Sequence, residues 1–333
     1  MYESLGISVI LAALLLLNAG ASGVTALIWR LITQMVASFS ARTRSDLLLT
    51  LRLAAPAFSI VVVVLFIVPA YLDYEPRNTA EIVSKKLAAL ALVSLASIGF
   101  ALWRTIRSWR ATAKLRRQWL QKAERIHMPG IDVPAFRISH HFPIIAIVGT
   151  LRPRLFIADN VLSSLNQDEI AAAIAHERAH LAARDNLKRT LLRLCSDSLF
   201  LVPFGRTVEC MWAESIESAA DEFAARQSPA TALNLASALV TIAKMVPAGA
   251  RADVPLGAYL VGAAETQGVR SRIRRLIEMS SNGSLRRMSN SPSHLLPVVS
   301  FAVFAVVAAI AASSPKVLIG VHEILEFAVK VLC

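Results

Sequence analysis

A group of polar residues that could do chemistry lies inside an apolar stretch, IAHERAHLAARDN, at residues 174–186. On a helix, His176 and His180 project from the same side one turn apart, so that both imidazoles can reach one ion. Glu177 follows the first histidine, about 100° further round the helix. In the HExxH motif two neutral imidazoles hold zinc, and the glutamate accepts a proton from the attacking water. A polar stripe that simply faces solvent is the alternative, and the motif alone does not exclude it.

A zinc ion held by two histidines needs a third protein ligand, and the segment WAESIESAADEFAAR at residues 212–226 offers candidates. Glu217 and Asp221 are four residues apart, on one face of a predicted helix. We predict that Glu217 is the third ligand and that Asp221 accepts a hydrogen bond from a ligand histidine, which fixes its tautomer. Glu214, one turn earlier, is the competing ligand. An acidic pair at this spacing is also common on a solvated helix face, so the assignment depends on the HExxH motif.

Elements that could position these residues lie on both sides of the motif. The stretch FRISHHFPIIAIVGTLRPRLFIAD, residues 136–159, alternates β-branched and aromatic residues around a turn-prone centre, which predicts a strand pair. Residues 166–169, NQDE, form a capping-box-like start for the alanine-rich helix that carries the histidines. Residues 190–204 are apolar but contain two charged residues. We therefore expect a re-entrant or interfacial hairpin there, which returns Glu217 to the histidines.

The composition places these elements beside a membrane. The chain of 333 residues is 55% hydrophobic and carries 35 Lys+Arg against 23 Asp+Glu, a net charge of +12. Its basic residues crowd beside apolar runs, as in cytoplasmic loops of membrane proteins, so the charge does not indicate nucleic-acid binding. Its cysteines lack CxxC spacing, which disfavours a Cys-based zinc or redox site. Four apolar stretches are near the length of a transmembrane helix: residues 6–29, 53–71, 87–103 and 295–314.

The charges of the connecting loops predict how these spans are oriented. The first stretch could be a signal peptide, because NAGASG resembles a cleavage site, but its acidic start and continued apolar pattern favour a retained span. Arginines follow the first and third spans, so the positive-inside rule places the amino terminus outside and residues 104–287 in the cytoplasm. We expect three parts: a membrane region with three transmembrane helices at 1–104, a cytoplasmic zinc metallopeptidase domain at 105–293, and a last transmembrane helix with a short tail at 294–333.

The sequence HERAHLAARDN, followed by ESAAD, resembles the gluzincin pattern HExxH…ExxxD of membrane metallopeptidases. Its surroundings are similar to the M56 family, the BlaR/MecR-type peptidases, over about residues 140–280. Four features carry the resemblance: VGTLRPRLFIAD, LNQDEIAAAIAHERAH, the pair Asp185-Asn186 and VRSRIRRLIEM. The fold class that this implies is mainly α, a multi-span membrane protein with a cytoplasmic gluzincin-like α+β metallopeptidase domain built from a small strand pair and active-site helices.

The resemblance also implies roles for single residues. Glu177 is expected to be catalytic, and Asp221 and Asp185 to support the metal ligands from behind. The expected zinc ligands are His176, His180 and Glu217. Two positions depart from the family pattern: Arg178 stands where an apolar residue is common, and Glu214 where an arginine is common. BlaR-type sensors carry a penicillin-binding domain after the last span, where this chain has a short tail, so direct β-lactam sensing is not expected.

The function implied is that of a zinc endopeptidase in the cell inner membrane, in contact with membrane lipid, that cleaves a protein or peptide substrate such as a transcriptional repressor. An HtpX/Ste24-like (M48) quality-control protease is the nearest alternative, although that pattern usually has glycine where this chain has Ala179. A catalytically silent signalling module is disfavoured by the intact HExxH…E set, and no recognition motif supports direct nucleic-acid binding. The substrate is expected to lie along the edge of the strand pair. The oxyanion stabiliser stays unassigned between Arg226 and the pair His140-His141.

Overall fold

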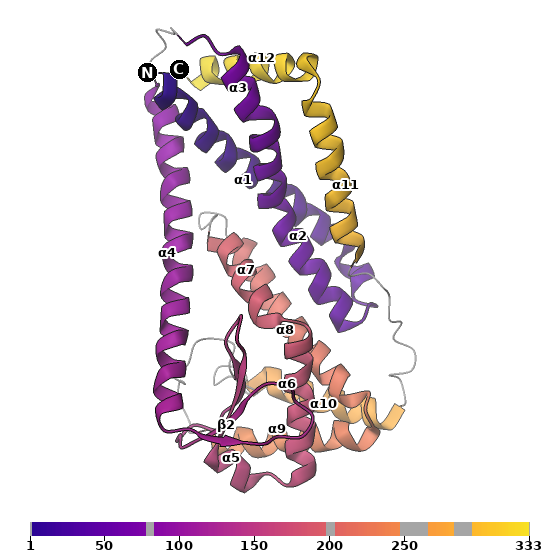
Figure 1. Cartoon of the computed structure of the whole chain (residues 1–333). Coiled ribbons are helices and arrows are strands. Elements are labelled where there is room, and N and C mark those ends of the chain that lie inside the picture. Colours follow the sequence, from indigo (N-terminus) through magenta and orange to yellow (C-terminus); the bar gives the residue numbers. More distant parts are fainter. Residues whose placement is uncertain (1, 78–82, 198–203, 247–265, 283–294, 333) are drawn as a thin grey trace.

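The computed structural model describes residues 2–77, 83–197, 204–246, 266–282 and 295–332 (Figure 1). This part of the chain is mostly helical. Long apolar helices form one end of the molecule, and shorter helices with one small sheet form the other. The mainly α fold class with a small β component is therefore confirmed.

Among the described residues, three long helical segments have the length and apolar composition needed to cross a membrane. They contain the three apolar stretches predicted in the N-terminal region. The first segment packs against both of the others. The segments are α1 (Tyr2–Val36), a composite of α2 (Ala41–Val62), the π-helical turn η1 (Val63–Ile67) and α3 (Val68–Tyr74), and α4 (Lys85–Gln121).

Helix α4 joins the two ends of the molecule. It begins at a cap in which the Ser84 hydroxyl accepts a hydrogen bond from the N–H of Leu87 (3.2 Å). It then passes the predicted domain boundary at residue 104 and ends only at Gln121. No glycine or proline occurs from residue 100 to 121, so nothing in the sequence breaks the helix there. The apolar span and the basic segment after it therefore form one continuous helix.

A four-stranded sheet follows α4, where the sequence predicted only a strand pair. The strand order is β1-β2-β4-β3, so β1 and β3 are the edges. β2 and β4 are parallel, and the other two pairings are antiparallel. The strands are β1 (Glu124–Ile126), β2 (Ala135–Ile138), β3 (Ile145–Val148) and β4 (Arg154–Ala158). The predicted segment, residues 136–159, contains β3, β4 and most of β2, whereas β1 lies before it.

Shorter helices pack around this sheet. Leu155, Phe156 and Ile157 of β4 are completely buried and form the centre of the core. The predicted capping box is present: the side chain of Asn166 accepts from the N–H of Glu169, and the carboxylate of Glu169 accepts from the N–H of Asn166, both at 2.9 Å. The helices are α5 (Asp159–Ser164), α6 (Gln167–Ala182), α7 (Asp185–Asp197), α8 (Phe204–Ala225), α9 (Pro229–Met245) and α10 (Thr266–Asn282).

Helices α7 and α8 correspond to the predicted hairpin, whose tip at 198–203 lies outside the described residues. Arg184, at φ 53°, adopts the left-handed conformation that turns the chain from α6 into α7. α7 and α8 contact each other, and both pack against α2. Helix α7 also contacts α4 and so reaches between the long helices (Figure 1).

The last described segment contains two helices, α11 (Leu295–Ala312) and α12 (Pro315–Leu332). They meet at an angle of 91°, and α12 packs against α3. The short tail expected after the last span is therefore a helix. Its apolar residues Leu325 and Val329 recur at helical spacing and pack on the cluster around Tyr71. Most of the predicted linker at 280–293 lies outside the described residues.

Candidate metal centre

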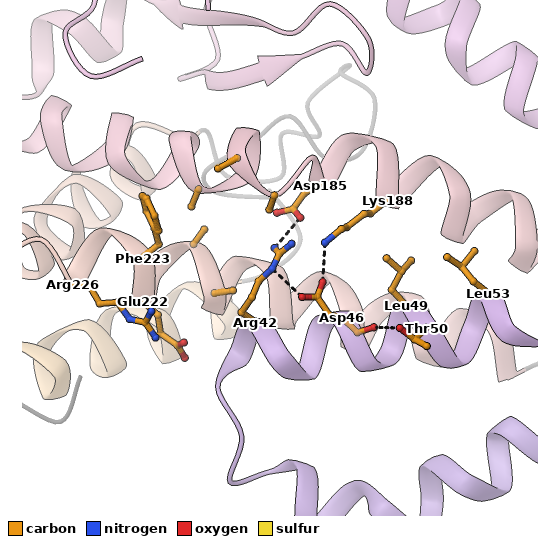
Figure 2. Close-up of a pocket in the computed structure, with 15 residues that line it drawn as sticks. Arg42, Asp46, Leu49, Thr50, Leu53, Asp185, Lys188, Glu222, Phe223 and Arg226 are labelled. Atoms are coloured by element: carbon orange, nitrogen blue, oxygen red, sulfur yellow. Dashed lines mark hydrogen bonds and ion pairs between the residues drawn. The ribbon is translucent and has the colours of Figure 1, made fainter. Parts of the chain in front are cut away.

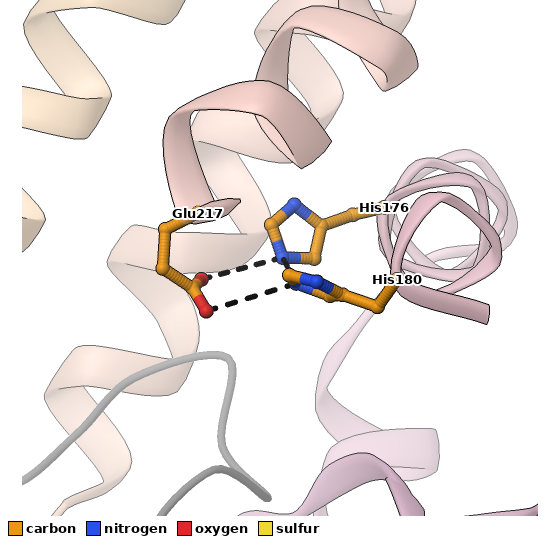
Figure 3. A group of neighbouring side chains, drawn as sticks. All are labelled: His176, His180 and Glu217. Carbon is orange, nitrogen blue, oxygen red and sulfur yellow. Dashed lines mark hydrogen bonds and ion pairs between the residues drawn. The ribbon is translucent and has the colours of Figure 1, made fainter. Parts of the chain in front are cut away.

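Helix α6 presents His176 and His180 to one point in space (Figure 3). Their Nε2 atoms lie 3.2 Å apart, and their rings meet at an interplanar angle of 79°. A tetrahedral zinc ion with bonds of about 2.0–2.1 Å holds two ligand nitrogens about 3.3 Å apart. The two imidazoles therefore have the separation that two ligands of one such ion require.

Helix α8 brings the carboxylate of Glu217 to the same point. Its Oε2 lies 3.5 Å from Nε2 of His176, and its Oε1 lies 3.7 Å from Nε2 of His180. One ligand atom from each of the three residues lies within 4.8 Å of the others, a spacing at which the group could hold a metal ion. The Oε2 atom of Glu217 is buried, and Nη1 of Arg272 lies 3.2 Å from it. Two imidazole nitrogens and one carboxylate oxygen are a donor set that zinc binds, so the group fits a metal ion.

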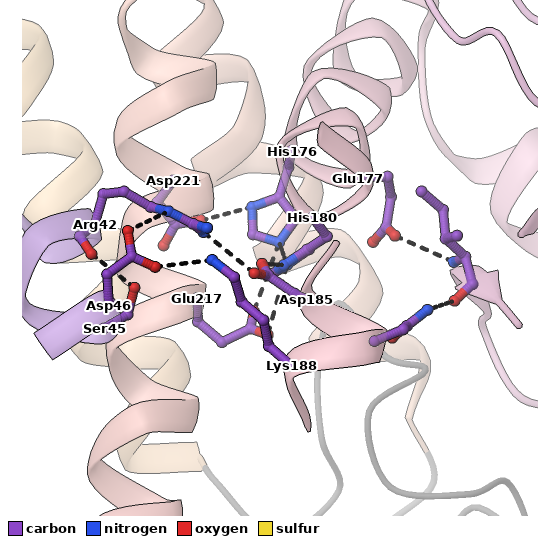
Figure 4. Close-up of polar contacts among 12 residues, drawn as sticks. Arg42, Ser45, Asp46, His176, Glu177, His180, Asp185, Lys188, Glu217 and Asp221 are labelled. Atoms are coloured by element: carbon purple, nitrogen blue, oxygen red, sulfur yellow. Dashed lines mark hydrogen bonds and ion pairs between the residues drawn. The ribbon is translucent and has the colours of Figure 1, made fainter. Parts of the chain in front are cut away.

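Each of these histidines has a carboxylate at its other ring nitrogen (Figure 4). Oδ1 of Asp221 lies 3.0 Å from Nδ1 of His176, and Oδ2 of Asp185 lies 2.8 Å from Nδ1 of His180. Both carboxylates are buried. A carboxylate in this place holds the N–H at Nδ1 and leaves the Nε2 lone pair for a metal ion. The structure thus brings all of the predicted metal-site residues together.

Glu177, the predicted base, lies beside the histidines at the edge of the sheet. Its side chain is buried, and its Oε2 accepts a hydrogen bond from the N–H of Ile147 in strand β3 (3.2 Å). Burial raises the pKa of the Glu177 carboxyl above its ordinary value, and the charges of His180 and His176 offset only part of that effect. A raised pKa makes the carboxylate a better proton acceptor, so this environment suits a general base.

A cavity of about 370 Å³ lies over the site. The side-chain amide of Asn186 donates to the carbonyls of Ile147 (3.0 Å) and Gly149 (3.2 Å), which ties the start of α7 to β3. Gly149 has φ +112°, and a Cβ there would approach the carbonyl oxygen of Arg152 to 2.8 Å, so this turn requires glycine. The site residues that line the cavity are Glu177, His180, Asp185 and Glu217.

Arg272 of helix α10 belongs to the site, a role that was not predicted from the sequence. Its Nε and Nη2 donate to the two carboxylate oxygens of Asp221, both at 2.8 Å, and its Nη1 lies 3.2 Å from Oε2 of Glu217. The fork of a guanidinium suits such a bidentate contact. Arg272 is one of four arginines in VRSRIRR, but its position on the helix distinguishes it. It falls between the buried residues Val269 and Leu276, at helical spacing on the face that packs inward.

The buried charges of the site shift each other's pKa. Burial disfavours a charged His176, but the carboxylates of Asp221 and Glu217 outweigh that effect and raise the pKa of His176 to about 9. Burial alone would raise the pKa of Glu217, but His176, His180 and Arg272 lower it to about 2. The pKa of Asp221 is lowered in the same way, by Arg272 and His176. Without a metal ion, His176 therefore carries a proton at neutral pH.

This proton predicts how metal binding depends on pH. An imidazole binds a metal in its neutral form, so the ion must displace the proton from His176. We expect the affinity for a divalent metal to rise with pH by about tenfold per pH unit up to about pH 9, and then to level off. Calorimetric titration in buffers with different protonation enthalpies should show release of about one proton at pH 7. An affinity that stays constant over this interval would contradict the assignment.

Other residues considered from the sequence lie elsewhere. Glu214 is exposed on α8. Arg226 lines a different cavity, and neither His140 nor His141 lines the cavity over the site. Arg189 of α7 does line it and stands over the ring of Trp212 at 5.8 Å, so it is a cation near the site that the sequence did not reveal.

Two histidines and a glutamate could hold a metal ion, and a buried carboxylate lies beside them. The same chain has long apolar helices that could cross a membrane. Together these features define the class of membrane-associated metallopeptidases. The family model described as BlaR1 peptidase M56 matches residues 30–251, more than half of the chain. The chain belongs to this family, as the resemblance of its motifs predicted. No curated protein matches the chain.

Proposed function

We propose that this protein is a zinc-dependent membrane endopeptidase. The observation that carries the proposal is the convergence of His176, His180 and Glu217 on one point, with the separate carboxylate of Glu177 beside them. Two imidazole nitrogens and one carboxylate oxygen leave one position of a tetrahedral ion open. An open position is typical of catalytic zinc sites, whereas structural sites are closed. Membership of the M56 family supports peptide-bond hydrolysis as the reaction.

A bound zinc ion would polarise the scissile carbonyl and lower the pKa of the attacking water. Glu177 accepts the proton of that water, because its carboxylate is buried beside the histidines and has a raised pKa. The same carboxyl group then gives the proton to the leaving amine. Asp221 and Asp185 hold the ligand imidazoles in one orientation throughout.

Strand β3 offers an edge on which an extended substrate can bind by β-addition. Among the described strands, β3 has a neighbour, β4, on one side only. On the free side the N–H of Ile147 donates to Glu177, and the carbonyl of Ile147 accepts from Asn186. A substrate strand that pairs with Ile147 replaces these partners. Substrate binding therefore frees the carboxylate of Glu177 for proton transfer.

We propose further that the substrate is a regulatory protein, such as a transcriptional repressor, cleaved in BlaR/MecR-like signalling at the inner membrane. The M56 family match supports this role over quality control. Ala179 supports it too, since HtpX-type proteases usually have glycine at that position.

The substrate can be sought by comparing cytoplasmic protein fragments in cells that carry this protein or its Glu177→Gln form. We expect a fragment that forms only with the unchanged protein, and an intact precursor that is trapped on the variant. Glu214→Gln, a matched change at an exposed glutamate, serves as the control and should behave like the unchanged protein. Identical fragments with both forms would rule out proteolysis by this site in those cells.

Orientation in the membrane gives a separate prediction. A reporter fused after Arg125 or Arg287 should behave as cytoplasmic, and one fused after Lys330 as extracytoplasmic, because arginines follow the first and third spans. The two chain ends lie together, far from the sheet, which agrees with this expectation (Figure 1). Paired fusions to alkaline phosphatase and a fluorescent protein measure it. Reporters at Arg125 and Arg287 on opposite faces would refute the proposed cytoplasmic domain.

A further inference from the structure

Helices α2 and α7 run side by side in the same direction and are joined by three polar contacts, two of which Figure 2 shows. Nη1 of Arg42 donates to Oδ1 of Asp185 (3.2 Å), and Nζ of Lys188 donates to Oδ1 of Asp46 (2.8 Å). Further along, Nη2 of Arg52 donates to the carbonyl of Cys195 (2.7 Å). The residues in these pairs are separated by 143, 142 and 143 positions. The near-constant separation means that the two helices keep one register along their whole contact.

The first of these contacts reaches the metal centre. The two oxygens of Asp185 have different partners: Oδ2 lies 2.8 Å from Nδ1 of His180, and Oδ1 accepts from Arg42. Asp185 is buried, and the positive charge of Arg42 stabilises its carboxylate from outside the metal site. Arg42 also lies 3.3 Å from Oδ2 of Asp46, which links the first contact to the second. A continuous chain of charged groups therefore runs from α2 to a metal-ligand histidine (Figure 4).

Apolar packing holds the register between these contacts. Leu48 and Leu49 of α2 form a buried cluster with Leu192 of α7 and Trp212 of α8. Arg52 is buried and caps a carbonyl in the last turn of α7, where the helix leaves its carbonyls without partners. The charged residues Arg42, Asp46, Asp185 and Lys188 line a cavity of about 590 Å³, which α6 and α8 also line (Figure 2). The contact of α2 with α7 therefore combines apolar packing with charged pairs beside this cavity.

We propose that α2 is part of the support of the metal site, and that Arg42 is the positioning residue through which it acts. The register of α2 against α7 sets the orientation of Asp185, which sets that of His180 and so the metal affinity. The inference rests on the proposed function only in taking His180 as a metal ligand. α2 belongs to a segment long and apolar enough to cross a membrane, so this support links that segment to the metal centre.

The test is a double-mutant cycle on the full-length protein in detergent. Arg42→Gln, Asp185→Asn and the double variant are titrated with zinc against a chelator of known affinity. Cobalt absorption spectra of each then report the geometry of the site. We expect Arg42→Gln to weaken zinc binding by about tenfold and to change the cobalt spectrum in the same direction as Asp185→Asn. The double variant should bind no more weakly than Asp185→Asn alone, because the two residues act through one path.

Two further variants keep the test decisive. Arg30→Gln, at an exposed arginine of α1, should leave affinity and spectrum unchanged. Arg42→Lys keeps the charge but cannot contact Asp185 and Asp46 with a guanidinium fork, so its affinity should lie between those of the unchanged protein and Arg42→Gln. Unchanged affinity in both Arg42 variants, or additive losses in the double variant, would overturn the inference. Peptidase activity is not the readout, so an unchanged protein that binds zinc but cleaves nothing would refute the proposed function without affecting this test.

Discussion

Replacing Glu177 with glutamine is expected to give a protein that still binds zinc but no longer hydrolyses peptides. The amide has the size of the carboxyl group, and its oxygen can still accept the hydrogen bond from Ile147 that holds the side chain at the edge of β3. It cannot take a proton from the attacking water. Loss of a positioned general base typically costs about 10²–10⁴-fold in rate, so we expect a fall of that size in kcat.

Two measurements on purified protein check this expectation: zinc content by elemental analysis, and the rate of cleavage of the substrate identified in cells. Glu214→Gln is the matched control, because it makes the same change at an exposed glutamate of α8. If Glu177→Gln cleaves at an undiminished rate with its zinc in place, another group takes the proton. If the zinc is lost, the defect lies in the metal site, and Glu177 supports the ligands in a way that the geometry does not indicate.

The part of the site that lies on α6 could be predicted because everything that determines it is local. The capping box at Asn166, the alanine-rich run and the HExxH spacing all fall within one helix. On any α-helix, residues four apart lie on one face, so His176 and His180 must converge whatever surrounds them. The structure places them as this argument requires.

The partners that come from distant parts of the chain were predictable only in part. Glu217 and Asp221 stand out by their spacing, but their approach to α6 depends on the burial of Ile216 and Ala220 on the same helix. Arg272 could have been found from its place in the inward-facing stripe of α10. Arg42 could not, because its contact with Asp185 spans 143 residues and no local pattern connects the two.

The first strand and the last helix were not predicted for a related reason. β1 is three residues long, too short for a periodic pattern, and its partner β2 is held in the sheet by β4. The sequence predicted only a short tail where helix α12 lies. The helix packs on α3 through Leu325 and Val329, whereas other large apolar residues such as Ile324 and Phe327 are exposed.

The choice of the third ligand gives the second prediction with a large effect, because four acidic residues crowd one short stretch of α8: Glu214, Glu217, Asp221 and Glu222. Glu222 is paired with Arg275. The structure separates them clearly. The carboxylate oxygens of Glu217 lie 3.5 and 3.7 Å from the two Nε2 atoms. Asp221 lies behind His176, at Nδ1, and Glu214 is exposed to solvent. Only Glu217 can therefore share an ion with both imidazoles.

Removing each of these carboxylates should have a graded effect on zinc. Glu217→Ala deletes a charged donor and should abolish stoichiometric binding. Asp221→Asn keeps the size of the side chain and an oxygen for Nδ1 of His176, but loses the charge that Arg272 and the imidazole share, so affinity should fall by about 10- to 100-fold. Glu214→Ala should retain zinc and activity. Elemental analysis and chelator competition on the three purified variants decide the order. No contact in the described site brings Glu214 to the histidines. Zinc that is retained in Glu217→Ala but lost in Glu214→Ala would therefore contradict this geometry and reassign the ligand to Glu214.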